Sequence, residues 1–429
     1  MTWFRPYPWA IMTIWRAGLV FCVVYFLGLI DLQQVTAFSN DRSDNLAAYW
    51  GQDSGGHQQR LSFYCQDDAL DVIPTAFLYV FFGQGGKPVV DFSNICSQGG
   101  NQFPNSDLAD CSFLASDIKE CQSKGKLITI SLGGATAKVG FSSAAQASDF
   151  AETIWDMFLG GQSSTRPFGD AVLDGIDLDI ESGSPSFYST FVDKIRALSK
   201  GSRKRYYLTA APQCPFPDAK VGDALNNADF DAVYVQFYNN YCEISKPSEF
   251  NFATWYCITS SSSDCTNSPE AHRDHWAKTT SPNPNVKVYI GAPAGPKAAG
   301  SGYVDASALI SMAKGVQSQY SSFGGVMLWD ADTAFDNDRF DLQIKNAIST
   351  GQGAPKSGAP TKPGTPTKPE ASTKAGALAK SSDVIASAII PADFRDPREK
   401  ARVKRPQGFS IKQQGRRSDQ PKFSRFFRF

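Results

Sequence analysis

The sequence has little that could bind a metal ion. Its 429 residues include only three histidines, and none of them belongs to an H-E-x-x-H pattern. None of the nine cysteines forms a C-x-x-C pair, which is a common spacing of structural zinc ligands. The N-x-[S/T] acceptor of N-linked glycans is missing as well. We therefore expect no metal site.

The chain also lacks an excess of charge of either sign, because 42 Lys and Arg balance 42 Asp and Glu. The balance hides a split, since residues 393–429 hold twelve basic and four acidic side chains and the rest of the chain is acidic. A negative folded part argues against nucleic acid as its main partner. The basic tail could bind an anionic polymer or a membrane surface, or it could have no function.

A long apolar run is missing too. Residues 17–30 carry no charge and follow Arg16, but 14 residues are too few to span a bilayer and are typical of the apolar core of a secretory signal. Small residues precede Phe38, so residues 1–37 are predicted to be a signal peptide. The mature protein would then be secreted, without stable membrane insertion. An uncleaved anchor over residues 11–30 is the alternative.

Apolar, β-rich runs recur eight times between residues 38 and 350, and helix-like stretches separate several of them. Runs that are aliphatic on both faces indicate parallel strands covered by helices. Eight repeats predict a closed α/β barrel of the (β/α)8, or TIM, type with its active site at the C-terminal ends of the strands. The predicted strands are 46–50, 75–82, 127–132, 175–181, 206–211, 232–238, 287–292 and 325–329, and the predicted helices include 106–124, 144–159, 185–200 and 305–319.

Two segments after the barrel are predicted not to fold. Residues 351–375 are rich in Pro, Thr, Lys and Gly, which cannot bury a core and is typical of an extended linker. Residues 376–429 are too few and too charged to fold alone, so we expect a disordered tail. The barrel would then occupy residues 38–350.

The most informative run is Leu-Asp-Gly-Ile-Asp-Leu-Asp-Ile-Glu at residues 173–181. Asp177, Asp179 and Glu181 fall at every second position, so a strand would place their carboxyl groups on one face. Because like charges repel and burial penalises ionisation, at least one pKa in this set should rise to what a general acid needs. A solvated polar face or half of a calcium loop is the alternative. The twelfth position of such a loop would be Tyr188, which offers no carboxylate.

This acidic run resembles the signature of glycoside hydrolase family 18, in particular the class III chitinases of fungi and plants. The resemblance covers residues 45–348 and rests first on Asp174-Gly175-x-Asp177-x-Asp179-x-Glu181. Ser-Leu-Gly-Gly at 131–134 is similar to the second signature of the family. Further similar stretches are 48–52, 207–214, 236–240 and 325–329.

The resemblance implies four catalytic residues. Glu181 would protonate the glycosidic oxygen, and Asp179 would orient the 2-acetamido group of the substrate, which attacks the anomeric carbon in place of a protein nucleophile. Asp177 would share a proton with Asp179, and Tyr238 would donate a hydrogen bond to the acetamido oxygen. The reaction would pass through an oxazolinium and retain the anomeric configuration, without a metal or an organic cofactor.

The resemblance also implies how the substrate is held. Trp329 would form the floor under the sugar at the cleavage point. Apart from the resemblance, a structural role is expected for Asp174, which lies at the start of the predicted strand and far from its catalytic end, and for Gly133, which suits a tight turn. Non-proline cis peptides are expected at Ala76–Phe77 and Trp329–Asp330. Further substrate contacts are expected from Tyr49, Gln52, Phe77, Gly134, Ala135, Gln236 and Asn239.

Removal of a signal peptide would leave eight cysteines, an even number that suits disulfides in an oxidising compartment. Eight cysteines permit 105 pairings, so the sequence alone does not fix the connectivity. The resemblance implies the first two pairs, and the positions of the others after strands and in a Ser-rich loop suggest the rest. The expected pairs are Cys65–Cys121, Cys96–Cys111, Cys214–Cys242 and Cys257–Cys265.

The sequence thus predicts a secreted, monomeric endochitinase that cleaves β-1,4 bonds between the N-acetylglucosamine units of chitin. An endo-β-N-acetylglucosaminidase acting on N-glycans is one alternative, because it uses the same acids. A non-catalytic lectin or inhibitor on the same barrel is another. Inactive members generally lose the proton donor or a neighbouring acid, and both are present in this chain.

Overall fold

The computed structural model describes residues 38–248, 250 and 276–349. The predicted signal peptide (1–37), linker (351–375) and tail (376–429) lie outside the described residues, as does the expected Cys257–Cys265 pair. Of the helices that these ranges contain, none is long and apolar enough to cross a membrane.

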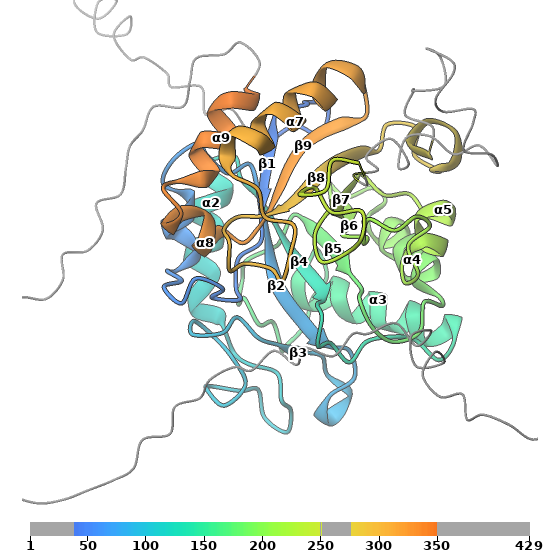
Figure 1. Cartoon of the computed structure of the whole chain (residues 1–429). Coiled ribbons are helices and arrows are strands. Elements are labelled where there is room, and N and C mark those ends of the chain that lie inside the picture. Colours follow the sequence, from blue (N-terminus) through green and yellow to red (C-terminus); the bar gives the residue numbers. More distant parts are fainter. Residues whose placement is uncertain (1–37, 249, 251–275, 350–429) are drawn as a thin grey trace, which may run out of the picture. The chain divides into compact units, whose positions relative to one another are not determined.

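Eight parallel strands close into a barrel, as the recurring apolar runs predict (Figure 1). The ring closes because β1 pairs in parallel with both β9 and β2. A short additional strand, β3, pairs antiparallel with β2. The strands are β1 (Asn45–Ala48), β2 (Val72–Val80), β3 (Val89–Val90), β4 (Leu127–Gly133), β5 (Gly175–Asp179), β6 (Tyr207–Ala210), β7 (Ala232–Gln236), β8 (Lys287–Pro293) and β9 (Phe323–Trp329).

Helices connect consecutive strands and lie around the barrel (Figure 1). Three of them begin at a side-chain cap. The Ser143 hydroxyl accepts from the Gln146 amide at α3, the Asp305 carboxylate accepts from the Ala308 amide at α7, and the Asp330 carboxylate accepts from the Thr333 amide at α8. The helices are α2 (Ala115–Ser123), α3 (Ala144–Phe158), α4 (Tyr188–Ser199), α5 (Gly222–Asn227), α7 (Ala306–Gln319), α8 (Ala331–Asp336) and α9 (Phe340–Ile348), with short turns η1 (Leu61–Cys65), η2 (Gln84–Gly86), η3 (Ser112–Leu114) and η5 (Trp276–Thr280).

The helix predicted at 106–124 begins later than its sequence pattern indicates. Helical structure starts only with η3, and α2 follows it directly. The preceding residues are held by the Cys96–Cys111 disulfide and by an antiparallel bridge between Gln102 and Ala109. A cross-link and strand pairing outweigh the weak helix propensity of so short a stretch, so the prediction is wrong for residues 106–111.

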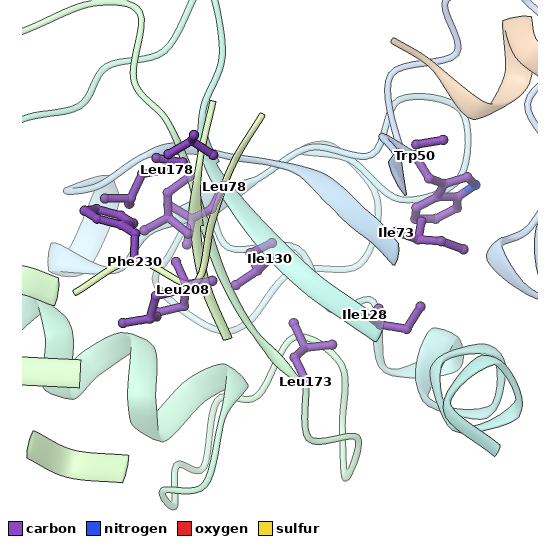
Figure 2. Close-up of a cluster of buried hydrophobic side chains, with 14 of the residues drawn as sticks. Trp50, Ile73, Leu78, Ile128, Ile130, Leu173, Leu178, Leu208 and Phe230 are labelled. Atoms are coloured by element: carbon purple, nitrogen blue, oxygen red, sulfur yellow. The ribbon is translucent and has the colours of Figure 1, made fainter. Parts of the chain in front are cut away.

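The two faces of β5 separate apolar from acidic side chains, as its period of two predicts. Ile176 and Leu178 are buried in the core between strands and helices, where Figure 2 shows Leu178 among Leu208 and Phe230. Asp177 and Asp179 alternate with them and face the barrel interior. This alternation brings the carboxyl groups to one line inside the barrel.

Among the residues that the structure describes, three disulfides cross-link segments around the barrel. One links η1 to α2, one closes the loop after β3, and one joins the loop after β6 to the loop after β7. They are Cys65–Cys121, Cys96–Cys111 and Cys214–Cys242, which is the pairing expected for these six cysteines.

A buried ion pair ties α9 to the strands. The Lys345 ammonium donates to the Asp71 carboxylate and to the Asp44 carbonyl oxygen (2.8 Å), and each side chain of the pair is 4% exposed. Replacing Lys345 by methionine is expected to lower the free energy of unfolding by about 3–5 kcal/mol, because Asp71 would stay buried without its counter-charge.

Urea unfolding measures this loss. The double variant Asp71→Asn/Lys345→Met removes both charges and is expected to be more stable than the single Lys345→Met variant. A single variant as stable as the unaltered protein would contradict the assignment.

Candidate active site

A cavity of about 320 Å³ opens at the C-terminal ends of the barrel strands. This is where the fold places functional residues. Most of the residues singled out in the sequence lie together in its wall, although they come from segments far apart in the chain. They are Gln52, Phe77, Gly133, Gly134, Ala135, Asp179, Glu181, Gln236, Tyr238, Asn239 and Trp329.

Asp177 lies deeper in the barrel, is fully buried, and is held by three hydroxyl groups. Its Oδ2 accepts hydrogen bonds from Tyr49 (2.7 Å) and Ser131 (2.6 Å), and its Oδ1 accepts one from Thr209 (2.7 Å). Burial raises the pKa of Asp177, and the three hydrogen bonds oppose that rise. Tyr49 is 1% exposed, so its role is to hold Asp177 rather than to contact the substrate.

Asp179 is the middle member of the acid set, which consists of Asp177, Asp179 and Glu181. Its Oδ1 accepts a hydrogen bond from the side-chain amide of Gln236 (2.8 Å), which also donates to the Ala211 carbonyl oxygen (2.9 Å). Burial raises the pKa of Asp179 well above its usual range, and the negative charges of Glu181 and Asp177 raise it further. The set therefore binds protons that separated carboxyl groups would release.

Glu181 lies two residues beyond the end of β5, because the strand stops at Asp179 instead of continuing to 181 as the sequence suggested. Its carboxyl group is in the cavity wall. Burial raises the pKa of Glu181 to about 7, with a further contribution from the negative charge of Asp218. A carboxyl group that keeps its proton near neutral pH can serve as a general acid.

Asp218 is a buried acid that sequence reasoning missed. Its carboxylate accepts hydrogen bonds from the backbone amides of Gln213 (2.8 Å), Lys220 (2.7 Å) and Val221 (2.7 Å). These three donors fix a carboxylate near the acid set, and its charge raises the pKa of both Asp179 and Glu181. It lies in the irregular segment after β6, where no periodic pattern marks it.

Aromatic rings form one wall of the cavity. The rings of Phe77 and Trp329 stack with centroids 5.8 Å apart, and Tyr49 packs against Trp329 at 5.5 Å. The peptides Ala76–Phe77 and Trp329–Asp330 are both cis, as expected. The wall therefore offers a partly exposed indole face, which suits the apolar face of a sugar ring.

Two glycines let the backbone approach closely at this wall. Gly133 and Gly134 have φ values of +127° and +92°, which L side chains rarely adopt. A Cβ at Gly133 would lie 1.8 Å from the Asp179 carbonyl oxygen, and one at Gly134 would lie 2.8 Å from the Phe77 ring. Gly134 therefore shapes the cavity, and Gly133 fixes β4 against β5.

Two amides in the wall are engaged with the protein itself. The Gln52 side chain donates to the carbonyl oxygens of Ala76 (2.8 Å) and Asp91 (3.1 Å). The Asn239 side-chain oxygen accepts from the Ser301 amide (3.0 Å). Both residues reach the cavity, and both also hold neighbouring loops in place.

Asp174 lies away from the cavity, as its place at the start of β5 suggested. Its carboxylate accepts from the Ile128 amide (2.8 Å) and from Gln122 (2.9 Å), and it forms an ion pair with Lys204 (2.8 Å). Four cavity residues were not anticipated, because their positions depend on how the loops fold. They are Tyr79, Asp91, Thr136 and Ala298.

Over the ranges that the structure describes, no group of three His, Cys, Asp or Glu side chains could hold a metal ion. The cavity wall combines a carboxyl group of raised pKa, a buried acid beside it and a tyrosine hydroxyl. Such a set can donate a proton at one atom and stabilise a positive charge a few atoms away.

Comparison with known proteins gives the same family as the acid signature. Residues 45–334 match Glycosyl hydrolases family 18. Chitinase 2 of Rhizopus oligosporus is 45% identical over 320 residues, which cover 74% of this chain and 54% of that protein. The chain thus spans about half the length of the curated relatives it matches.

Solved structures share the fold. The ICChI chitinase from Ipomoea carnea is 34% identical with a TM-score of 0.55, covering 71% of this chain and 99% of that one. The xylanase and α-amylase inhibitor protein XAIP-II from Scadoxus multiflorus is 33% identical with a TM-score of 0.57, covering 71% and 98%. The family match includes all eight barrel strands and the acidic run on β5. The chain belongs to glycosyl hydrolases family 18.

Proposed function

We propose that the protein is a secreted, monomeric endochitinase that hydrolyses β-1,4 bonds between the N-acetylglucosamine units of chitin. The complete acid set carries this proposal: Glu181 and Asp179 share a cavity wall with Tyr238 and Trp329, and Asp177 lies behind them. The chitinase relatives support the choice of substrate. Secretion rests on the N-terminal run at residues 17–30.

In the proposed reaction Glu181 gives its proton to the glycosidic oxygen while the bond from that oxygen to the anomeric carbon breaks. The acetamido oxygen of the same sugar forms the new bond to the anomeric carbon, giving an oxazolinium. Water then attacks this intermediate and returns a proton to Glu181. The acetamido group takes the place of a protein nucleophile, so the substrate must be N-acetylated at the cleavage point.

Asp179 acts on the acetamido group in this scheme. A negative Asp179 orients the amide N–H and stabilises the positive charge that develops on the oxazolinium. Because two adjacent buried acids cannot comfortably both ionise, one proton passes between Asp177 and Asp179 during the cycle. The hydroxyl of Tyr238 donates to the acetamido oxygen, and Trp329 packs under the sugar ring.

Incubation of the protein with chitin hexasaccharide tests the proposal, with products identified by mass spectrometry. Shorter N-acetylglucosamine oligomers are expected, and cellohexaose should stay intact because it has the same linkage but no acetamido group. Release of no oligomers, or equal cleavage of cellohexaose, would refute it. Release of the glycan from an N-linked glycopeptide in a parallel reaction would favour the endo-β-N-acetylglucosaminidase alternative.

A second function has one observation in its favour. A solved structure 33% identical to this chain is described as an inhibitor of xylanase and α-amylase. Inhibition of either enzyme by the protein, together with absence of chitin cleavage, would favour a non-catalytic role. The raised pKa of Glu181, about 7, favours the hydrolase because an inhibitor has no need of a proton donor.

The charge of Asp218 gives a pH-dependent prediction. General acid catalysis requires protonated Glu181, so activity should fall as pH rises through the pKa of that group, about 7. Asp218→Asn removes a negative charge that raises this pKa. The alkaline limb of the kcat/KM profile is therefore expected to move to lower pH.

The matched control is Asp223→Asn, which removes an exposed acid on α5. It should leave the profile in place. An unchanged alkaline limb in Asp218→Asn would show that Asp218 does not tune the proton donor.

A further inference from the structure

Gln213 follows β6 and lies against the end of β7. Backbone hydrogen bonds join the two segments on both sides of Gln213. The backbone amide of Gln236 donates to the Pro212 carbonyl oxygen (2.8 Å), and the backbone amide of Cys214 donates to the backbone carbonyl oxygen of Gln236 (3.3 Å). The backbone amide of Gln213 itself donates to Asp218 (2.8 Å). The backbone of Gln213 is therefore fixed beside the acid set.

The side chain of Gln213 connects Glu181 to the loop after β7. Its Nε2 donates a hydrogen bond to Oε2 of Glu181 (3.3 Å), and its Oε1 accepts one from Nδ2 of Asn240. Nδ2 of Asn240 also donates to the Tyr238 carbonyl oxygen (3.3 Å). Because this nitrogen can only donate, the oxygen of Gln213 must face Asn240 and the nitrogen must face Glu181.

A disulfide fixes the two loops that carry this arrangement. Cys214 is the neighbour of Gln213, and Cys242 lies two residues after Asn240; their Cα atoms are 6.0 Å apart. Both cysteines are fully buried. The distance between the two amides is thus constrained by a covalent bond as well as by hydrogen bonds.

We propose that Gln213 is a positioning residue for the proton donor: its N–H holds Oε2 of Glu181 and leaves Oε1 to carry the proton. This inference rests on the proposed hydrolase function. In a protonated carboxyl group the carbonyl-type oxygen is the better hydrogen-bond acceptor, so the oxygen that receives the N–H is the one without the proton. The O–H bond at Oε1 then breaks while the proton forms a bond to the glycosidic oxygen. The carboxylate that results keeps the hydrogen bond from the N–H of Gln213.

The charged and titratable groups around Glu181 set the sign of the effect. Asp218 places negative charge near it, Asp179 lies beside it with Asp177 behind, and Tyr238 faces it from the loop after β7. The Lys220 ammonium binds the nearby Gly183 carbonyl oxygen. The charge of Asp218 raises the pKa of Glu181, whereas an N–H donor favours its ionised form, as the side-chain amide of Gln236 does. Loss of Gln213 and loss of Asp218 should therefore shift the pH profile in opposite directions.

The test compares the full chain with its Gln213→Leu variant on chitin oligosaccharides. We expect kcat to fall at least tenfold, which is the effect of losing one hydrogen bond to a charged group. KM should change less than twofold, and the alkaline limb of kcat/KM should move to higher pH. Unchanged kcat and an unchanged limb in a variant with the same Tm would overturn the proposal.

Asn240→Leu keeps the test available if Gln213→Leu does not fold. It leaves Gln213 in place but removes the donor that orients its amide, so a smaller change of the same sign is expected. Carbon-13 NMR titration of the Glu181 carboxyl group gives a readout that needs no activity. A pKa of Glu181 that does not rise in either variant contradicts the role of Gln213, whereas an unaltered protein that cleaves no chitin contradicts the proposed function alone.

Discussion

Replacing Glu181 by glutamine is expected to reduce kcat on chitin oligosaccharides by about 100- to 10,000-fold, the range that a positioned general acid contributes. Glutamine keeps the size and shape of the side chain but has no acidic proton. The carboxyl group it replaces has a pKa of about 7, raised first by burial and then by Asp218, so it is mostly protonated below neutral pH. The departing sugar would then have to leave as an alkoxide.

Binding and folding should survive this substitution. Glu181→Gln is expected to bind chitin oligosaccharides with nearly unaltered affinity in calorimetry, because the aromatic wall and the backbone are unaffected. Glu152→Gln is a matched control, since it removes an exposed carboxylate on α3 that pairs with Lys194 at the surface. A Glu181→Gln variant with more than a tenth of the original kcat would show that Glu181 is not the general acid.

Asp179→Asn is expected to lower kcat by about 100- to 1,000-fold, which is the usual loss when one group that stabilises transition-state charge is removed. Asparagine is isosteric and can still accept the hydrogen bond from Gln236 at the position of Oδ1. It cannot become negative, so the oxazolinium loses its counter-charge. The effect should appear in kcat rather than in KM, because the charge develops only as the glycosidic bond breaks.

Asp177→Asn is the informative comparison for Asp179. Asp177 is fully buried, is not part of the cavity wall and is held by three hydroxyl groups, so it acts on the substrate only through its neighbour. We expect its replacement to reduce kcat less than Asp179→Asn does. The opposite order, measured on the same oligosaccharides, would contradict the placement of Asp179 next to the acetamido group.

The sequence was sufficient to predict the barrel and to predict that the acid set shares one face of its strand. Alternation of Ile176 and Leu178 with Asp177 and Asp179 has a direct physical meaning, because only a strand separates such residues onto two faces. The structure places the aliphatic pair in the core and the acids inside the barrel. Short aliphatic runs at regular spacing likewise predicted all eight strands.

Other features depend on contacts between distant segments and leave no local pattern. Asp218 and Gln213 lie in irregular chain after β6, and only the folded protein shows them next to Glu181. Tyr49 was expected to contact the substrate, and its burial against Asp177 follows from the closure of β1 onto the barrel. A periodic pattern indicates which face of a segment is buried, whereas the position of a loop depends on the distant residues that it contacts.

The anomeric form of the first product tests the central claim most directly. If the acetamido group of the substrate is the nucleophile, two inversions at the anomeric carbon retain the configuration. Proton NMR of chitin hexasaccharide during the first minutes of hydrolysis, before mutarotation, should therefore show new reducing ends in the β form. New reducing ends in the α form would mean that water attacks the anomeric carbon directly, and they would contradict a mechanism in which the acid set assists the acetamido group.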